Sequence, residues 1–237
     1  MSTTDLKFFT NEPERDLYSR FSAILKSNTQ FFDVLVGYFR SSGFFNMYES
    51  LETVEKIRVL VGLNVDLFTV KIIDLANEEY SPTALSNNQS KEILEAEVEQ
   101  EFAEAEVSSD VEKGVRIFVD WLKCGKLEMR MYTKAPIHAK VYIMRKDPKK
   151  VPDMYGSVIT GSSNFSAAGL KNNLEFNVEL KDAPDVEFAL QHFEKLWEDG
   201  IDIRETYIDA VEKKTWMRDD ITPYELYLKT IYEFFKE

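Results

Sequence analysis

The sequence is poor in the residues that form disulfides and metal sites. Its 237 residues include one cysteine, Cys124, and two histidines, His138 and His192. A single cysteine cannot form a disulfide within the chain, which fits a reducing compartment such as the cytoplasm. So few sulfur and imidazole ligands also argue against a zinc cage. We therefore expect no metal and no other cofactor.

Long apolar runs are also missing. No stretch approaches the ~18 consecutive apolar residues of a transmembrane helix. The first five residues lack the basic end and the apolar run of a signal peptide. Hydrophobic residues still make up 44% of the chain, which is enough for a full core. These features predict a cytoplasmic protein with no membrane partner.

One stretch of the chain lacks positive charge, and another has little negative charge. Residues 92–112 contain nine acidic residues and no lysine or arginine, whereas residues 123–150 contain nine basic and two acidic residues. The formal net charge of −13 disfavours tight binding to nucleic acid, but the basic stretch offers a polyanion a locally positive site. The alternative is that both stretches are solvated faces.

Strand-like and helix-like segments alternate in the first third of the chain. Residues 33–39 and 56–63 are short apolar runs typical of buried strands, with a helical pattern between them and another near residues 67–75. This order predicts parallel strands joined by right-handed crossovers. We therefore expect an α/β fold with a mixed, largely parallel β-sheet flanked by helices.

The rest of the chain adds strands and then helices. Residues 81–90 are polar and predict a loop. We expect one domain over residues 1–200 and a helical extension over residues 201–237. Further strands are expected at 127–132, 138–145, 157–160 and 174–180, and later helices at 184–199, 204–216 and 223–235.

The most informative feature is a histidine and a lysine two residues apart. His138 and Lys140 fall in an alternating segment, which would put both side chains on the same face of a sheet. Histidine can act as a nucleophile or carry a proton near neutral pH, and lysine can stabilise an anion. A lone His-x-Lys pair occurs often by chance, so it needs support from elsewhere in the chain.

That support comes from a Gly-Ser-x-Asn turn and a following glutamate. Gly161 lets the backbone approach a ligand, and Ser162 and Asn164 offer short hydrogen-bond donors. Glu175 follows eleven residues after Asn164. Asn164 could instead cap a helix that begins near residue 165, and Glu175 could instead pair with Lys171. Together the groups predict metal-free phosphoryl transfer.

This pattern resembles the phospholipase D superfamily, whose motif runs His-x-Lys, Gly-Ser-x-Asn and, in the nuclease branch, a glutamate about eleven residues on. The family often has an aspartate five residues after the lysine, where this chain has Arg145. Residues 33–45 followed by 56–64 also resemble the N-terminal half of the phospholipase D-like domains fused to superfamily-two helicases. Residues 193–197 and 222–227 resemble the segment that leads into such a helicase. The chain has no phosphate-loop motif, so it has no helicase motor of its own, and the extension over residues 201–237 could link it to a helicase domain.

The resemblance implies a mechanism and a partner. His138 would attack phosphorus and form a phosphohistidine, Glu175 would orient its imidazole, and Lys140, Ser162 and Asn164 would bind the phosphoryl oxygens. The family needs two His-x-Lys motifs, whereas this chain has one and His192 lies in a helical pattern. A homodimer with the active site at the two-fold interface is therefore implied.

Three functional hypotheses remain open at this stage. The first is a DNA endonuclease linked to a helicase in DNA processing, restriction or defence, with DNA preferred over RNA and with Lys134, Arg145 and Lys146 contacting the nucleic acid. The second is a non-catalytic, dimerising nucleic-acid-binding module. The third, a phospholipid hydrolase, is disfavoured because no basic amphipathic helix is evident. Tyr132 and Tyr142 flank the site and are candidates for base stacking.

Overall fold

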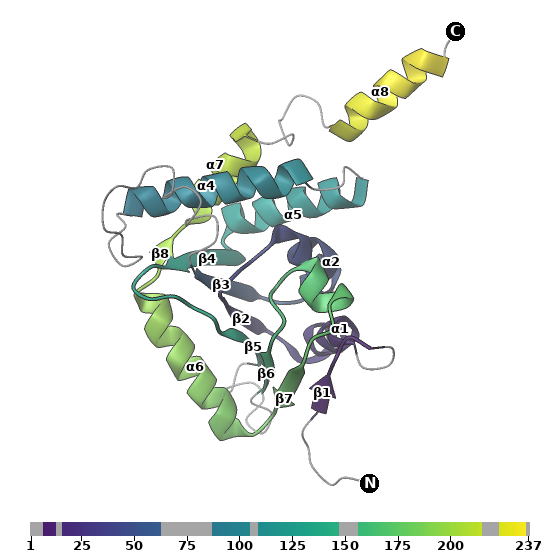
Figure 1. The fold of residues 1–237 in the computed structure, drawn as a ribbon. Helices are drawn as coiled ribbons and strands as arrows, with labels where there is room; N and C mark the ends of the chain where they lie inside the picture. Colours follow the sequence, from purple (N-terminus) through teal and green to yellow (C-terminus); the bar gives the residue numbers. More distant parts are fainter. Residues whose placement is uncertain are drawn as a thin grey trace.

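One β-sheet forms the centre of the molecule. The computed structural model describes residues 7–12, 16–62, 87–104, 109–146, 156–214 and 223–235. Within these ranges eight strands form a single sheet with helices on both faces (Figure 1), which confirms the expected mixed α/β fold. From edge to edge the strands are β1 (Lys7–Phe9), β7 (Asn177–Leu180), β6 (Gly156–Gly161), β5 (Lys140–Arg145), β2 (Phe31–Val36), β3 (Lys56–Gly62), β4 (Leu127–Tyr132) and β8 (Ile201–Asp202).

The strand directions correct one part of the prediction. β2–β3 and β3–β4 are parallel as expected, but the other five pairs among the described strands are antiparallel. The expectation of a largely parallel sheet was therefore wrong. A crossover through α2 (Ser41–Leu51) returns the chain to the same end before β3. Residues 133–139 instead start β5 at the end where β4 finishes, so β5 runs opposite to β2.

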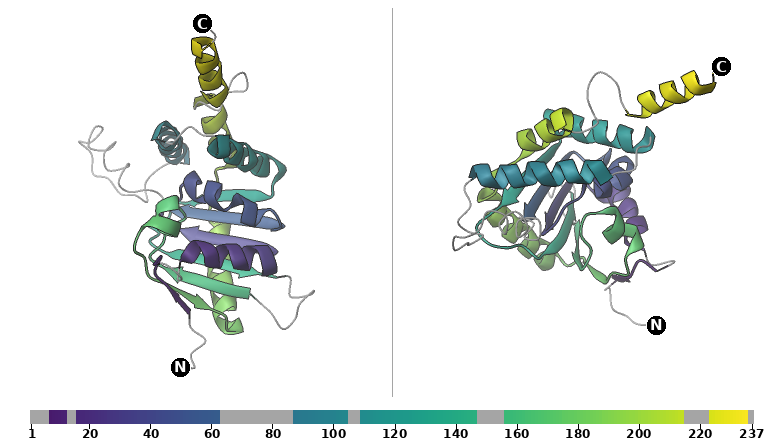
Figure 2. Two further views of the ribbon diagram at one scale, coloured as in Figure 1. Left: turned by 90° about the vertical axis from the view of Figure 1, so that its right-hand side faces the viewer. Right: turned by 45° about the horizontal axis from the view of Figure 1, so that its top comes forward.

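The two faces of the sheet carry separate cores. Strand alternation sends Val34 and Val36 into a large core and Leu35 into a smaller one. Figures 1 and 2 show α6 (Ala183–Glu198) on one face of the sheet and the other helices that cover the sheet on the opposite face. The large core packs under α1 (Leu17–Asn28), α2, α4 (Asn87–Glu104), α5 (Ser109–Cys124) and α7 (Arg204–Lys214), and the smaller core packs under α6 (Ala183–Glu198).

Two predictions about the segment before α4 have different outcomes. Helix α4 begins at Asn87, so the last four residues of the predicted loop at 81–90 are helical. Polar residues occur both in loops and in the first turn of helices, so composition could not separate the two. Residues 81–86 and the helix predicted near residues 67–75 lie outside the described residues.

The predicted C-terminal extension is continuous with the body over its first part. β8 pairs with β4, and α7 packs against α4. Helix α8 (Pro223–Phe235) projects away from the sheet in Figures 1 and 2. The proposed division at residue 200 stays a prediction. Among the described helices, none combines the length and apolarity needed to cross a membrane.

A network of ion pairs joins three strands to α6. Arg58 Nε donates to Asp33 Oδ1 over 2.6 Å, and its terminal nitrogens donate to Glu194 over 3.0 and 2.8 Å. Arg145 Nε donates to the second oxygen of Asp33 over 3.1 Å. The Asp33 side chain is 1% exposed, so this carboxylate depends on protein donors in place of water.

We expect Arg58→Leu to lower the free energy of unfolding by about 3 kcal/mol, because Asp33 would lose one of its two charge partners while remaining buried. Urea denaturation measures the change. Arg116→Leu is the matched control, because Arg116 forms an exposed pair with Glu112 on α5 that contributes at most about 0.5 kcal/mol. Equal losses in the two variants would contradict this account.

Candidate active site

The predicted site residues converge at one end of the sheet. Val36, the last residue of β2, pairs with Lys140, the first residue of β5. Gly161, the last residue of β6, pairs with Asn177, the first residue of β7. The His-x-Lys segment, the Gly-Ser-x-Asn turn and the chain around Glu175 therefore meet at the same end. We call this end, where β2, β3, β4 and β6 finish and β5 and β7 begin, the motif edge.

His138 and Lys140 lie together at the motif edge. His138 is exposed and Lys140 is half-buried. β5 begins at Lys140, so His138 precedes the strand that was expected to include it. Lys140 Nζ donates to the backbone carbonyl of His138 over 2.9 Å. Within the described residues no carboxylate pairs with this ammonium group, so its charge is available to an anion.

The Gly-Ser-x-Asn turn packs against the segment that carries Glu175. A Cβ atom at position 161 would lie 2.2 Å from the Phe176 carbonyl oxygen, so Gly161 is required for this approach. Ser162 N donates to that same carbonyl over 3.1 Å. Ser162 Oγ donates to Glu175 Oε2 and accepts from Phe176 N over 3.0 Å. Ser162 and Glu175 are thus bonded directly.

Glu175 does not contact His138 in the single chain. Among the described residues its side chain accepts from Ser162 and, over 3.3 Å, from Asn173 Nδ2. The implied role of Glu175 in orienting His138 therefore stays a prediction. The alternative pairing with Lys171 is not observed, because Lys171 Nζ donates to Asn46 over 2.8 Å.

Asn164 has an unused hydrogen-bonding group. Its Oδ1 atom is buried and has no hydrogen-bond partner. The alternative role as a helix cap is not observed, since Ser166 Oγ accepts from Gly169 N over 3.1 Å at the start of the short π-helix η2 (Ala168–Asn172). A buried carbonyl oxygen without a donor is costly. This atom can only accept a hydrogen bond, so binding of a phosphoryl oxygen by Asn164 would use its Nδ2 group instead.

The three basic residues predicted to contact nucleic acid are not gathered at the motif edge. Lys134 lies in the link before His138, where its ammonium pairs with Asp199 over 2.6 Å on the surface. Arg145 is the last residue of β5, about 17 Å from Lys140 at the usual rise per strand residue, and Lys146 follows it. Arg145 is also held by Asp33. Contact with nucleic acid by these residues stays a prediction.

Sequence reasoning missed a buried polar group behind the turn. Ser163 and Asn177 are each 0% exposed and bond to one another. Tyr142, a candidate for base stacking, is also 0% exposed, so it cannot stack on a base; its hydroxyl donates to the Ser163 carbonyl over 2.7 Å. The sequence signal that could have found Asn177 and Tyr142 is their spacing from the motif. Asn177 follows Glu175 by two residues, and Tyr142 follows Lys140 by two.

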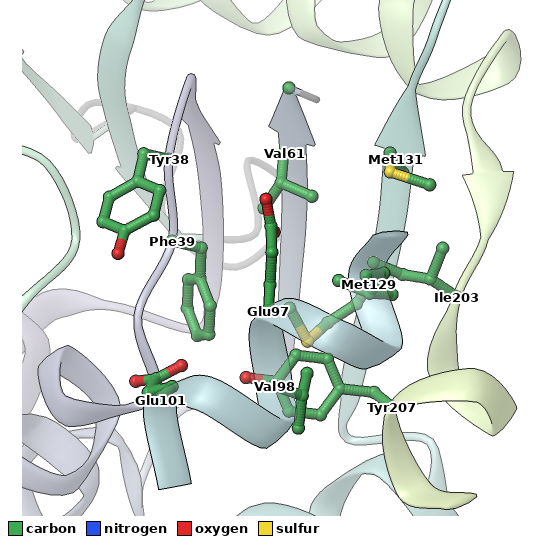
Figure 3. Close-up of a pocket in the computed structure, with 12 residues that line it drawn as sticks. Tyr38, Phe39, Val61, Glu97, Val98, Glu101, Met129, Met131, Ile203 and Tyr207 are labelled. Carbon is green, nitrogen blue, oxygen red and sulfur yellow. The ribbon is translucent and has the colours of Figure 1, made fainter. Parts of the chain in front are cut away.

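A small cavity lies beside the motif edge, beneath α4 and the ends of β2, β3 and β4 (Figure 3). Its volume is about 30 Å³, room for about two water molecules. The wall is mostly apolar, with Tyr38, Tyr207, Glu97 and Glu101 as its polar members. Burial raises the pKa of the Glu101 carboxyl above its ordinary value of 4.5.

Comparison with known proteins identifies the family. The family model described as "Cardiolipin synthase, PLD-like domain" matches residues 22–197, a range that includes every residue of the motif. The chain belongs to the PLD-like domain family. The resemblance to the phospholipase D superfamily is therefore confirmed. A search of curated proteins gave no match.

Three solved structures are similar to this chain at low sequence identity. Nuc of Salmonella typhimurium, described as a phospholipase D family member, is 16% identical over 84% of this chain and 97% of that chain, with a TM-score of 0.44. NucT from Helicobacter pylori is 13% identical over 84% and 98%, with a TM-score of 0.46. Phosphatidylserine synthase from Haemophilus influenzae is 11% identical over 98% of this chain and 45% of that chain, with a TM-score of 0.50.

We expect Glu101→Gln to change how stability depends on pH. Because the folded-state pKa of Glu101 is raised, the folded state binds the proton more tightly than the unfolded state, and wild type loses stability as pH rises from about 4.5 through the raised value. The substituted glutamine would keep an acceptor for Ser41 Oγ and Ser42 N, which Glu101 binds over 2.8 and 3.3 Å, without this penalty. The stability of Glu101→Gln relative to wild type should therefore increase as pH rises.

Thermal denaturation between pH 4 and pH 8 measures this difference. Glu49→Gln, at an exposed position on α2, is the control and should follow wild type across the range. Parallel curves for wild type and Glu101→Gln would show that the buried carboxyl imposes no such penalty.

Proposed function

We propose that this protein is a phosphodiesterase that cleaves nucleic acid, DNA in preference to RNA, through a phosphohistidine and without a metal ion. The supporting observation is the assembly at the motif edge. His138 and Lys140 precede and begin β5, Ser162 and Asn164 follow β6, and Glu175 precedes β7. The fold thus gathers a nucleophile, donors for an anion and a carboxylate from three segments distant in sequence.

The proposed reaction has two steps. An imidazole nitrogen of His138 attacks phosphorus, a P–N bond forms, and the P–O bond to the departing strand breaks as a second histidine protonates the leaving oxygen. That second histidine then removes a proton from water, which attacks phosphorus and releases His138. Lys140, Ser162 and Asn164 donate to the phosphoryl oxygens as their charge increases.

The second histidine must come from outside the chain's own motif. His192 lies on the exposed side of α6, stacked on Phe188 with ring centroids 6.3 Å apart, and α6 covers the face of the sheet opposite the large core. It cannot serve the motif edge. We therefore propose a homodimer in which His138 of a second copy supplies the acid and base.

Exposed apolar side chains support a dimer at this place. Leu174 and Phe176 flank Glu175 directly and are 81% and 62% exposed. Phe8 on edge strand β1 is 44% exposed and packs its ring 5.3 Å from that of Phe176. Large apolar side chains grouped beside a polar site are typical of an interaction surface.

The biological setting extends the proposal. We propose that the chain is the nuclease part of a helicase-linked system for DNA processing, restriction or defence in the cytoplasm. The second hypothesis, a nucleic-acid-binding module without turnover, is motivated by Arg145 at the family's aspartate position and by the net charge of −13. Both hypotheses use the motif edge, and they differ in whether a phosphodiester bond is broken.

A cleavage assay on plasmid and oligonucleotide DNA in EDTA separates these hypotheses. We expect wild type to cleave, and His138→Ala to lose activity by about 10³-fold or more because the nucleophile is gone. His192→Ala is the matched control, since it removes the chain's other histidine, and it should cleave as wild type does. Cleavage that requires magnesium would refute the mechanism. Binding of DNA without cleavage by any variant would favour the second hypothesis.

Phe176→Asp should convert the dimer to a monomer and abolish cleavage, because the new charge would be buried in the interface. Light scattering coupled to size exclusion measures the mass. Phe188→Asp, at a position 73% exposed on α6, is the matched control and should remain dimeric. A dimer that survives Phe176→Asp, or a wild type that is monomeric and still cleaves DNA, would refute this arrangement.

A further inference from the structure

The motif leaves one position of its turn unspecified, and the structure gives that position a distinct environment. Ser163 stands between the two proposed phosphate-binding residues, Ser162 and Asn164. Ser162 is exposed and Asn164 is half-buried, whereas Ser163 is 0% exposed. Its side chain and both backbone polar groups have hydrogen-bond partners within the protein. Ser163, in the middle of the turn, is therefore held by hydrogen bonds to the protein interior, while Ser162 and Asn164 lie nearer the solvent.

Asn177 holds Ser163 through both ends of its amide. Asn177 Nδ2 donates to Ser163 Oγ over 2.9 Å, and Ser163 N donates to Asn177 Oδ1 over 3.3 Å. Asn177 is 0% exposed. An amide carries a donor and an acceptor on one rigid group, so few other side chains could make both bonds. The first residue of β7 thereby fixes the turn that follows β6.

Tyr142 ties the same residue to the His-x-Lys strand. Its hydroxyl donates to the Ser163 carbonyl over 2.7 Å. Tyr142 follows Lys140 by two residues on β5, so both side chains lie on the same side of the sheet. Its ring contacts Phe21 with centroids 4.9 Å apart. Burial, with the nearby charge of Glu175, raises the pKa of Tyr142 well above its ordinary value, so the phenol keeps its proton and remains a donor.

The three hydrogen bonds connect β5, the end of β6 and the start of β7 beneath the motif. Each partner is removed from water, so losing one bond would leave an unsatisfied polar group and shift the turn. We infer that Tyr142 and Asn177 are positioning residues, which set the separation between Lys140 and the Ser162–Asn164 turn and thereby the affinity of the site for a tetrahedral anion.

The inference rests on the proposed function, because it assumes an anion at the motif edge. Its test uses Tyr142→Phe, which removes the hydroxyl and keeps the ring that packs against Phe21. Asn177→Ala is the second variant. Tyr207→Phe is the matched control, since Tyr207 is a tyrosine buried to 2% exposure on α7 in the large core, where it lies outside the turn.

The first measurement is the affinity for tungstate by titration calorimetry, with tungstate as a stable tetrahedral anion. We expect Tyr142→Phe and Asn177→Ala to weaken binding by about tenfold or more, because small displacements of aligned donors have large effects. Tyr207→Phe should stay within about twofold of wild type while losing a similar amount of thermal stability. Equal affinities in Tyr142→Phe and Tyr207→Phe would overturn the inference.

The second measurement is hydrogen exchange of a peptide covering residues 161–166. Tyr142→Phe should speed exchange there while helices such as α5 keep the wild-type rate. A uniform increase in exchange rate over the chain, or no increase in residues 161–166, would show that Tyr142 does not position the turn and would overturn the inference. If wild type binds no tungstate, the proposed function fails, and this exchange result alone decides whether Tyr142 and Asn177 fix the turn.

Discussion

At the motif edge, two pairs of chain segments approach so closely that no side chain fits between them. A Cβ atom at Gly161 would lie 2.2 Å from the Phe176 carbonyl oxygen, and one at Gly37 would lie 2.3 Å from the Ile137 carbonyl oxygen. The first approach seats the turn on the chain beside Glu175. The second seats the residue before His138 on the end of β2. Both distances are far below van der Waals contact, so a larger residue at either place would displace a motif segment.

Strand alternation then separates the chemistry from the charge network. Lys140 lies on the large-core side of β5 with Tyr142, whereas Arg145 falls on the opposite side and meets Asp33. The residue five positions after Lys140, Arg145, therefore belongs to the ion-pair network that reaches α6. Its positive charge matches the negative charge of its partner Asp33 on β2. An arginine at the family's usual aspartate position forms an ion pair there with Asp33, and it leaves the donors of the motif edge unchanged.

Local patterns predicted the parts of the structure that depend on neighbours in sequence. The alternating segments became strands, and the spacing of His138, Lys140, Gly161 and Glu175 identified the family and the end of the sheet where they meet. Periodicity carries no information on the direction of a partner strand, so the antiparallel pairs were missed. It also cannot separate an aromatic side chain that stacks on a ligand from one whose hydroxyl bonds inward, as in Tyr142.

The hydrogen bond between Ser162 and Glu175 joins two proposed roles that one hydroxyl proton cannot fulfil at the same time. Ser162 has one hydroxyl proton, and in this structure it is donated to Glu175. A phosphate oxygen bound by Ser162 would have to take that proton, which would leave Glu175 Oε2 without its donor. The half-buried carboxylate then needs a replacement, and an imidazole N–H of His138 is the donor that the proposed mechanism requires there. In the proposed mechanism, anion binding and orientation of the nucleophile would in this way be coupled through one proton.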